Sequence, residues 1–234
     1  MNIALILAGG TGSRMRSDGF PKQYVPVLGK PVLVYTLEKF QACPDVDTII
    51  VVTHQEWEHS VSQWAKQWNI SKFSGIAYQG DSRQASVRSG LLRCLQHSSS
   101  KDDLVLIHDS ARPLVTPSLI SACIQGAQGH DGCLPVIGVK DTIYCSHDGK
   151  TIHALTDRTT LFCGQSPEVL KLQPYMDLCK DMTSEELLQI RGSCELAFQH
   201  GWDISMIPGE ENNFKLTTAE DLTRLSKILE EASK

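Results

Sequence analysis

Three glycines and two cations lie within a short stretch directly after the first apolar run of the chain. The glycines are Gly9, Gly10 and Gly12, and the cations are Arg14 and Lys22. Glycines allow a ligand to approach the backbone N–H groups closely, and cations complete a binding site for an anion. The stretch therefore predicts a site for the triphosphate of a nucleotide.

The spacing of these glycines excludes the two best-known nucleotide loops. A P-loop requires Gly-x-x-x-x-Gly-Lys-Ser/Thr, which the sequence lacks. The dinucleotide fingerprint requires a third glycine three places after the second, where this chain has Met15. A tight turn between a strand and a helix is the alternative, but such turns rarely carry an arginine and a lysine at this spacing. A nucleoside triphosphate is therefore the favoured ligand.

A second cluster stands where the pattern predicts the start of a helix. It comprises Gly80, Asp81, Arg83 and Ser86. A helix N-terminus carries partial positive charge and free N–H groups, so it suits an anionic or polar ligand. Taken alone, the cluster would indicate an ordinary helix cap. Beside the glycine-rich stretch, it fits a nucleotide site.

A carboxylate follows the apolar run that ends at Ile107. Asp109 lies in the sequence His-Asp-Ser-Ala-Arg-Pro, which also contains Arg112. A carboxylate at the end of a strand and opposite a phosphate-binding loop is well placed to hold Mg²⁺. The alternative is an ion pair between Asp109 and Arg112. The neighbouring glycine-rich stretch favours the metal.

Two more groups of polar residues lie further along the chain. Lys140, Thr142 and Arg158 stand at the feet of an expected hairpin, whose turn contains Asp-Gly within residues 147–150. Such a hairpin in an α/β domain is either a surface flap or an arm that packs on another subunit. Lys215 precedes the last helical pattern, and capping of that helix does not explain a lysine there.

Short apolar runs alternate with helical patterns along the chain. Strands are predicted at 2–7, 48–53, 103–108 and 132–137, and helices roughly at 30–42, 55–68, 83–97, 116–127, 184–200 and 217–232. This alternation indicates an α/β fold with a Rossmann-like, mostly parallel sheet and helices on both faces. Ligands of such sheets bind at the carboxyl ends of strands, where the glycine-rich stretch falls.

The composition fits one folded domain over residues 1–234. Of the 234 residues, 41% are apolar, which is enough for a packed core. The net charge of -5 disfavours nucleic acid as a partner, because binding to its phosphates favours a basic surface. No apolar run approaches the roughly 20 residues of a membrane span, and the start of the chain does not have the pattern of a signal peptide. We therefore expect a cytoplasmic protein without nucleic-acid or membrane partners.

The motifs together resemble the cytidylyltransferases that act on 2-C-methyl-D-erythritol 4-phosphate and on D-ribitol 5-phosphate. The resemblance extends from Ala8 to Leu222. It is carried, in this order, by Ala-Gly-Gly-Thr-Gly-Ser-Arg-Met, Pro-Lys-Gln-Tyr, Arg-Gln-Ala-Ser-Val, His-Asp-Ser-Ala-Arg-Pro, Asp-Thr-Ile, Asp-Arg-Thr-Thr-Leu, Gly-Gln-Ser-Pro and Asn-Phe-Lys-Leu-Thr-Thr. It implies an enzyme that transfers CMP from CTP to a polyol phosphate, releasing pyrophosphate and forming a CDP-polyol.

The resemblance also implies a role for each matching residue. Arg14 and Lys22 would be catalytic cations at the α-phosphate, and Asp109 would bind Mg²⁺. The implied nucleotide-binding residues are Leu7, Ala8, Gly9, Gly10, Thr11, Gly12, Gly80, Asp81, Arg83 and Ser86. The implied acceptor-binding residues are Arg112, Thr142, Arg158 and Lys215. The family is dimeric, and the hairpin at about 141–160 would be an arm that brings Thr142 and Arg158 to the active site of the partner.

Two segments depart from the family pattern and leave the acceptor open. The family carries an acidic residue in a loop where this chain has Arg191 and Gly192, and its Gln-Thr-Pro-Gln motif reads Gln-Ser-Pro-Glu here, ending at Glu168. An acceptor of either family type would place the product in isoprenoid biosynthesis or make it a precursor of a cell-surface polymer. A different polyol phosphate is a third possible acceptor. The alternatives are a sugar-phosphate nucleotidyltransferase that uses another nucleotide, or a non-catalytic nucleotide-binding protein.

Overall fold

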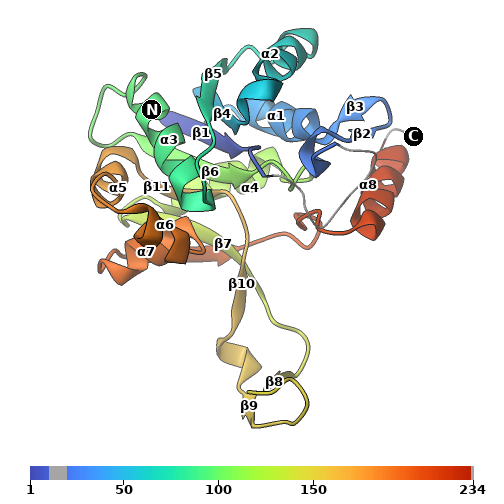
Figure 1. Cartoon of the computed structure of the whole chain (residues 1–234), viewed down its shortest axis with the longest axis vertical. Helices are drawn as coiled ribbons and strands as arrows, with labels where there is room; N and C mark the ends of the chain where they lie inside the picture. Colours follow the sequence, from blue (N-terminus) through green and yellow to red (C-terminus); the bar gives the residue numbers. More distant parts are fainter. Residues whose placement is uncertain (11–19, 233–234) are drawn as a thin grey trace.

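One eight-stranded sheet runs through the molecule (Figure 1). The computed structural model of the chain describes residues 1–10 and 20–232. The strands of the sheet are β1 (Asn2–Leu7), β4 (Thr48–Thr53), β5 (Phe73–Tyr78), β6 (Leu104–Asp109), β7 (Gly132–Gly138), β10 (Phe162–Gly164), β11 (Glu168–Lys171) and β12 (Ile204–Pro208). Their order is β10-β7-β11-β6-β1-β4-β5, with β12 also paired to β7.

Four of the seven strand pairs described in this sheet are parallel. β1 pairs in parallel with β4 and β6, β4 with β5, and β7 with β12. β11 is antiparallel to β6 and β7, and β10 is antiparallel to β7. The predicted mostly parallel sheet is thus confirmed, and the antiparallel strands enter it after the chain returns from the hairpin.

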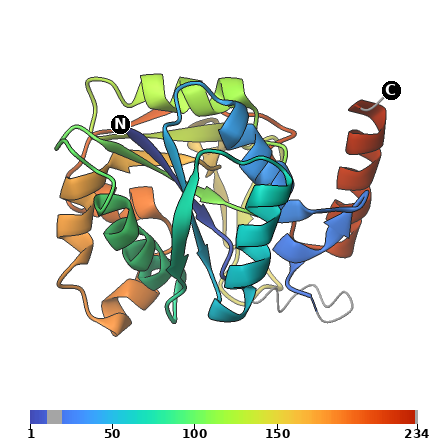
Figure 2. The ribbon, with the colours of Figure 1, turned by 90° about the horizontal axis from the view of Figure 1, so that it is seen from above.

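Helices cover both faces of this sheet (Figure 2). The helices are η1 (Lys22–Tyr24), α1 (Val32–Ala42), η2 (Gln55–Trp57), α2 (Glu58–Gln67), α3 (Arg83–Leu95), α4 (Pro117–Gly126), η3 (Arg158–Thr160), α5 (Leu172–Cys179), α6 (Ser184–Gln189), α7 (Ser193–Gln199) and α8 (Ala219–Ala232). In the described part of the chain, no helix is both long and apolar enough to cross a membrane.

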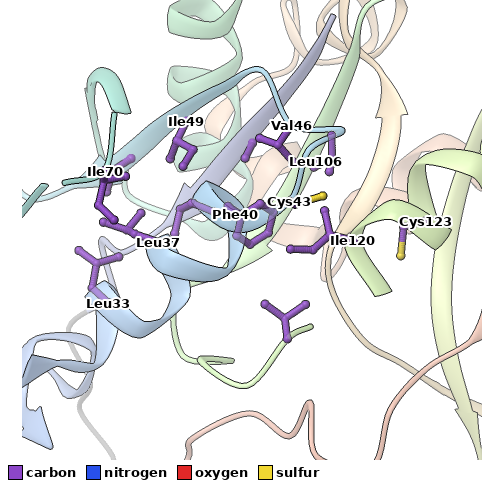
Figure 3. Close-up of a cluster of buried hydrophobic side chains, with 14 of the residues drawn as sticks. Leu33, Leu37, Phe40, Cys43, Val46, Ile49, Ile70, Leu106, Ile120 and Cys123 are labelled. Atoms are coloured by element: carbon purple, nitrogen blue, oxygen red, sulfur yellow. The ribbon is translucent and has the colours of Figure 1, made fainter. Parts of the chain in front are cut away.

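Alternation along the strands divides the core into two clusters. On β1, Ala4 and Ile6 pack with α1, α2 and α4, whereas Ile3 and Leu5 pack with α3, α5 and α7. Successive side chains of a strand point to opposite faces, so a strand covered on both faces is apolar throughout. Figure 3 shows the first cluster around Phe40 of α1. Each such buried side chain contributes about 1.5–3 kcal/mol.

The register of the central strands brings the candidate site residues to one edge. Leu7, the last residue of β1, pairs with Asp109, the last residue of β6. The glycine-rich stretch and the carboxylate therefore leave the sheet side by side. A third apolar cluster joins Leu216 and Leu225 near the C-terminus to Val32 and Tyr35 of α1, which brings the segment around Lys215 to the same edge.

The prediction of one helix over residues 184–200 is wrong, because the chain forms two helices there. α6 ends at Gln189, and α7 begins at Ser193. Ile190 has extended backbone angles, and Gly192 is the N-cap of α7. The backbone N–H groups of Arg191 and Gly192 donate to the carboxylate of Glu195, which satisfies them outside a helix. Strands β5, β10, β11 and β12 and helix α5 were not predicted.

A hairpin arm extends away from the sheet (Figure 1). It contains the short strands β8 (Ile143–Cys145) and β9 (Ala154–Thr156), which pair antiparallel to each other. A further short pair, β2 (Pro26–Val27) and β3 (Lys30–Pro31), lies beside α8. The predicted hairpin is confirmed, with its Asp-Gly turn between β8 and β9.

Candidate active site

A cleft of about 500 Å³ opens at the carboxyl edge of the central strands. The predicted site residues that line it are Leu7, Gly9, Gly10, Lys22, Gly80, Asp81, Arg83, Ser86, Asp109 and Lys215. They come from β1, η1, α3, β6 and the segment before α8, so the fold brings together residues that are far apart in sequence. The volume is within the range of small-molecule sites. Predicted residues Thr11, Gly12 and Arg14 lie outside the described residues.

The end of β1 is held in place by two buried side chains. Gln23 donates through Nε2 to the carbonyl oxygens of Ala8, at 2.6 Å, and Gly10, at 2.8 Å. The hydroxyl of Tyr24 donates to the same carbonyl of Ala8 at 2.8 Å. A Cβ on Gly9 would lie only 2.4 Å from Oε1 of Gln79, so a glycine fits this close approach. Ala8 thus takes part through its backbone, behind the cleft.

Lys22 lines the cleft from η1. Its Nζ donates to the carbonyl oxygen of Leu216 at 2.7 Å, which ties the glycine-rich stretch to the segment before α8. A lysine ammonium has three donors on a flexible stem. Its charge therefore faces the cleft from a position that the C-terminal segment helps to fix.

The N-terminus of α3 forms another wall of the cleft. Ser82 caps this helix by accepting from the backbone N–H of Ala85 at 3.0 Å, and Ser86 accepts from the N–H of Gly80 at 3.1 Å. A Cβ on Gly80 would lie 2.6 Å from the Cβ of Ala85, so the tight entry into the helix requires glycine. The cap is present, and the same turn also faces the cleft.

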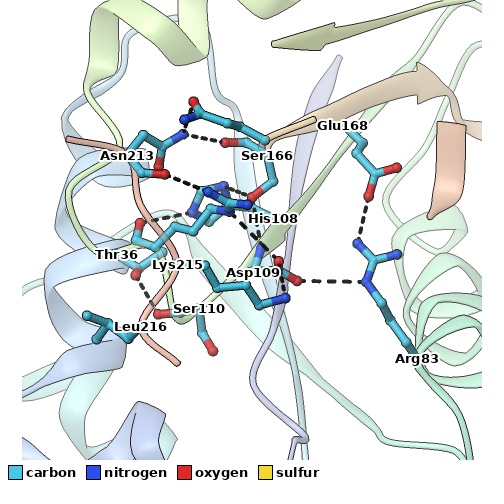
Figure 4. Close-up of polar contacts among 12 residues, drawn as sticks. Thr36, Arg83, His108, Asp109, Ser110, Ser166, Glu168, Asn213, Lys215 and Leu216 are labelled. Carbon is cyan, nitrogen blue, oxygen red and sulfur yellow. Dashed lines mark hydrogen bonds and ion pairs between the residues drawn. The ribbon is translucent and has the colours of Figure 1, made fainter. Parts of the chain in front are cut away.

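Asp109 is surrounded by three cations, of which Figure 4 labels Arg83 and Lys215. Its Oδ2 accepts from Nζ of Lys215 at 2.7 Å, and Oδ1 lies 3.8 Å from Nε of Arg83. Nε of Arg112 lies 3.9 Å from Oδ2. Burial alone would raise the pKa of the Asp109 carboxyl, but the three cations more than offset burial and hold that pKa well below its ordinary value. The carboxylate is therefore ionised and joins α3 to the C-terminal segment.

The residues around Asp109 are compatible with the predicted Mg²⁺. This ion typically binds to one or two carboxylates together with substrate phosphates and water. Among the residues that the structure describes, no group of three or more His, Cys, Asp and Glu side chains could hold a metal ion by itself. Further ligands would have to come from the nucleotide. Since 3.8 Å is beyond hydrogen-bond range, Oδ1 of Asp109 is available as a ligand.

The predicted acceptor residues are not all brought to the cleft. Lys215 lines it, whereas Arg112 lies behind Asp109 and donates through Nη1 to the carbonyl of Asn213 at 2.6 Å. Thr142 and Arg158 lie on the arm and do not line the cleft of their own chain. Arg158 instead donates to the carbonyl of Lys140 at the foot of the arm. Their predicted role in the partner subunit stays a prediction.

Several cleft residues were not predicted. They are Gln23, Gln79, Ser82, Ser110, Ala111 and Thr217. Most of them lie within the sequence motifs that carry the family resemblance, close to a predicted residue. Their position in those motifs is the sequence feature that could have identified them. Gln79 also precedes a predicted residue, Gly80, but it stands outside every motif and directly follows β5, a strand that was itself not predicted.

His108 supports the cleft from within the core. Its Nδ1 lies 3.0 Å from Oγ of Ser166, and its Nε2 lies 3.2 Å from the carbonyl oxygen of Arg112. Both contacts suit a neutral ring that accepts from the serine and donates to the carbonyl. Burial lowers the pKa of His108 to about 4, so the ring stays neutral at pH 7.

We expect this buried histidine to make stability pH-dependent in a defined window. The unfolded chain would bind a proton at His108 near pH 6.5 and the folded protein only near pH 4. The free energy of unfolding should therefore fall by about 3 kcal/mol as the pH falls from 6.5 to 4. Urea unfolding across this range should give a shallower pH slope for His108→Gln. The exposed His59→Gln serves as control, and an unchanged slope in His108→Gln would contradict the expectation.

The sequence profile described as 2-C-methyl-D-erythritol 4-phosphate cytidylyltransferase (IspD) matches residues 2–231. The chain belongs to this family. Its members are enzymes, so the predicted family and the prediction of an enzyme are both confirmed.

Relatives named for two different acceptors match nearly the whole chain. A 2-C-methyl-D-erythritol 4-phosphate cytidylyltransferase of Rubrobacter xylanophilus is 36% identical, over 97% of this chain and 94% of the relative. A ribitol-5-phosphate cytidylyltransferase of Streptococcus pneumoniae is 32% identical, over 98% and 99%. The cytidylyltransferase activity is common to both names, and the acceptor is what differs.

Solved structures of the family share the fold. A 4-diphosphocytidyl-2C-methyl-D-erythritol synthase superposes with a TM-score of 0.80 at 24% identity, covering 97% of this chain and 98% of that one. The 2-C-methyl-D-erythritol 4-phosphate cytidylyltransferase of Thermus thermophilus gives 0.74 at 23% identity, covering 97% and 98%. At these identities the similarity establishes the fold, and the predicted α/β architecture is confirmed.

Proposed function

We propose that this protein transfers CMP from CTP to a polyol phosphate, releasing pyrophosphate and forming a CDP-polyol. The observation that carries the proposal is the cleft of this chain, which belongs to a cytidylyltransferase family. Lys22, Arg83 and Lys215 line this cleft together with Gly9 and Gly10, which follow β1. Such a concentration of cations suits a triphosphate and a phosphate monoester held next to each other.

For this reaction the protein has to position the two substrates and neutralise the charge of their phosphates. An oxygen of the acceptor phosphate attacks the α-phosphorus of CTP in line, the new P–O bond forms, and the bond to the β-phosphate oxygen breaks. A phosphate monoester dianion is already a nucleophile, so no side chain has to remove a proton. Lys22 neutralises charge that develops at the α-phosphate, and Lys215 balances the incoming acceptor phosphate.

Asp109 is the residue that would hold Mg²⁺ when the nucleotide is bound. A bound Mg²⁺ supplies charge neutralisation on the phosphates. Nucleotide binding would also draw Lys215 from its 2.7 Å pair with Asp109 towards the phosphates, which frees a carboxylate oxygen. This is why we assign the carboxylate to the metal and the lysine to the substrate.

Pyrophosphate release tests this function directly. Wild-type protein with Mg²⁺ would be incubated with CTP, UTP or GTP and with 2-C-methyl-D-erythritol 4-phosphate, D-ribitol 5-phosphate or glycerol phosphate. We expect release with CTP and at least one polyol phosphate, and little with the other nucleotides. Preference for UTP or GTP would favour a different nucleotidyltransferase. CTP binding without turnover on every acceptor would favour a non-catalytic nucleotide-binding protein.

We further propose that the arm pairs two subunits and completes each active site with Thr142 and Arg158. The support is that neither residue lines the cleft of its own chain, while apolar arm side chains are largely exposed: Tyr144 by 56%, Ile152 by 68% and Leu155 by 67%. Exposed apolar side chains gathered on one protrusion are typical of a contact surface. We also propose a cytoplasmic location for the enzyme, with no nucleic-acid or membrane partner.

A charge on the arm should separate the subunits. We expect Leu155→Glu to shift the protein from dimer to monomer, because a charge cannot be buried unpaired in a contact. Turnover should fall about tenfold or more, because each active site would lose the hydrogen bonds that Thr142 and Arg158 of the other subunit make to a charged acceptor. Light scattering after size exclusion and a turnover assay measure the two effects. Lys150→Glu, at the exposed tip, is the control, and a monomeric wild type with full activity would contradict the proposal.

A further inference from the structure

Glu168 is a buried carboxylate directly behind the cleft. It begins β11, and only 8% of its side chain is exposed. Its Oε1 accepts from Nη2 of Arg83 at 2.6 Å, and its Oε2 accepts from the backbone N–H of Cys194 at 2.7 Å. Buried carboxylates are tolerated when they are paired in this way. Glu168 thereby joins α3, which lines the cleft, to the first turn of α7.

The contacts of Glu168 decide how Arg83 is presented to the cleft. A guanidinium is a rigid planar fork, so fixing two of its nitrogens orients the third. Nη2 of Arg83 is bound to Glu168, and Nη1 donates to Oγ of Ser193 at 3.3 Å. The remaining Nε edge faces Oδ1 of Asp109 at 3.8 Å (Figure 4). Glu168 thus determines which edge of Arg83 a nucleotide or its metal would meet.

We infer that Glu168 is a positioning residue of the transfer reaction, acting through Arg83 and coupling the cleft to the segment 190–194. The inference rests on the proposed function for its turnover measurement. If the ion pair were purely structural, Glu168 would contribute to the stability of the fold, and its loss would not act on substrates through Arg83. A positioning residue loses its effect on substrates once Arg83 is removed.

The segment opposite Glu168 leaves space for this carboxylate. A Cβ on Gly192 would lie 3.6 Å from Oε2 of Glu168, which is ordinary contact distance. The two departures noted in the sequence, the glutamate at 168 and the absence of an acidic residue at 191 and 192, therefore lie on the two sides of one contact. An aspartate at 192 would bring a carboxylate to the same place from the other side.

A glutamine at position 168 cannot replace both contacts. A carboxylate has two acceptor oxygens, and here one faces a guanidinium N–H and the other a backbone N–H. The amide of glutamine has one acceptor oxygen, so Glu168→Gln must set its own NH₂ against one of these two donors. The substitution keeps the volume and removes the positioning, which makes it the informative variant.

A double-mutant cycle on Glu168→Gln and Arg83→Ala tests the inference. We expect Glu168→Gln alone to lower kcat/KM for CTP about tenfold, as expected for a hydrogen bond to a charged group. In the Arg83→Ala background the same change should alter kcat/KM less than about twofold, because the residue through which Glu168 acts is gone. The exposed Glu185→Gln on α6 is the matched control and should be neutral.

Transfer of the carboxylate provides a rescue. Gly192 has φ -143° and ψ 154°, which any residue adopts, and it is the N-cap of α7, where aspartate is favoured. We expect Glu168→Gln/Gly192→Asp to recover at least half of the lost kcat/KM. Equal losses from Glu168→Gln with and without Arg83, or a loss that Gly192→Asp does not reduce, would overturn the inference.

A binding measurement beside the turnover assay distinguishes failure of this inference from failure of the proposed function. The same cycle is measured as CTP affinity by calorimetry, which requires no turnover. A wild type that binds CTP but releases no pyrophosphate contradicts the proposed function, while the affinity cycle still decides the coupling of Glu168 to Arg83. Additive effects on affinity and turnover in an active enzyme overturn the inference and leave the function intact. A wild type that does not bind CTP overturns both.

Discussion

Replacing Lys22 with alanine should lower turnover with CTP by about 10²–10³-fold, the usual cost of losing one preorganised charge at a reacting centre. The ammonium faces the cleft from η1 and donates to the carbonyl oxygen of Leu216 at 2.7 Å, so its position is fixed before substrate binds. Charge builds up on the α-phosphate only as the acceptor attacks. The loss should therefore appear mainly in kcat, measured by steady-state pyrophosphate release.

One variant separates charge from position at Lys22, and a second serves as the control. Lys22→Arg keeps the charge but presents it as a planar fork, so we expect an intermediate loss. Lys101 is an exposed lysine just before the start of β6, at the opposite end of the strand from the cleft. Lys101→Ala should leave turnover unchanged. Near-normal kcat in Lys22→Ala would show that this lysine is not a catalytic cation.

Asp109→Asn should have the second large effect, on both activity and stability. Removing the carboxylate leaves Arg112 and Lys215 without this counter-charge, and Arg83 then keeps only its pair with Glu168. Breaking a buried pair on one side typically costs about 3–5 kcal/mol. We expect a loss of about 3 kcal/mol in urea unfolding at pH 7, because the side chain keeps 16% of its surface exposed. Turnover should fall about 10²-fold, with a higher Mg²⁺ requirement.

The pH dependence of this difference follows from the sign of the pKa shift. The folded pKa of Asp109 lies below its unfolded value of about 4, so its contribution is complete above pH 4 and is lost as the pH falls further. The stability gap between wild type and Asp109→Asn should therefore close below pH 4, under the window expected for His108. Asp102→Asn, at an exposed turn, is the control. A gap that stays constant down to pH 2 would contradict the assignment.

Local patterns in the sequence predicted much of the sheet. The runs at 2–7 and 48–53 became β1 and β4 with the same bounds, because a strand buried on both faces is apolar along its whole length. β11 was not predicted, because its four residues, which begin with Glu168, are too few to show a repeating pattern of apolar and polar residues. The helical pattern over 184–200 carried no signal of the break at Gly192, which the carboxylates of Glu168 and Glu195 stabilise through the backbone N–H groups there.

The sequence by itself determined the family and the chemical types in the site, since the order of motifs and the spacing of glycines and cations are properties of the chain. Only the tertiary structure decided which charges meet. Lys22 contacts a carbonyl 194 residues away, Lys215 pairs with Asp109 across 106 residues, and Arg83 pairs with Glu168 across 85. The register of β1 against β6 and the packing of α8 on α1 set the first two pairs, and the pairing of β11 with β6 places Glu168 for the third. Contacts between distant residues depend on how the elements pack, and no local pattern encodes that packing.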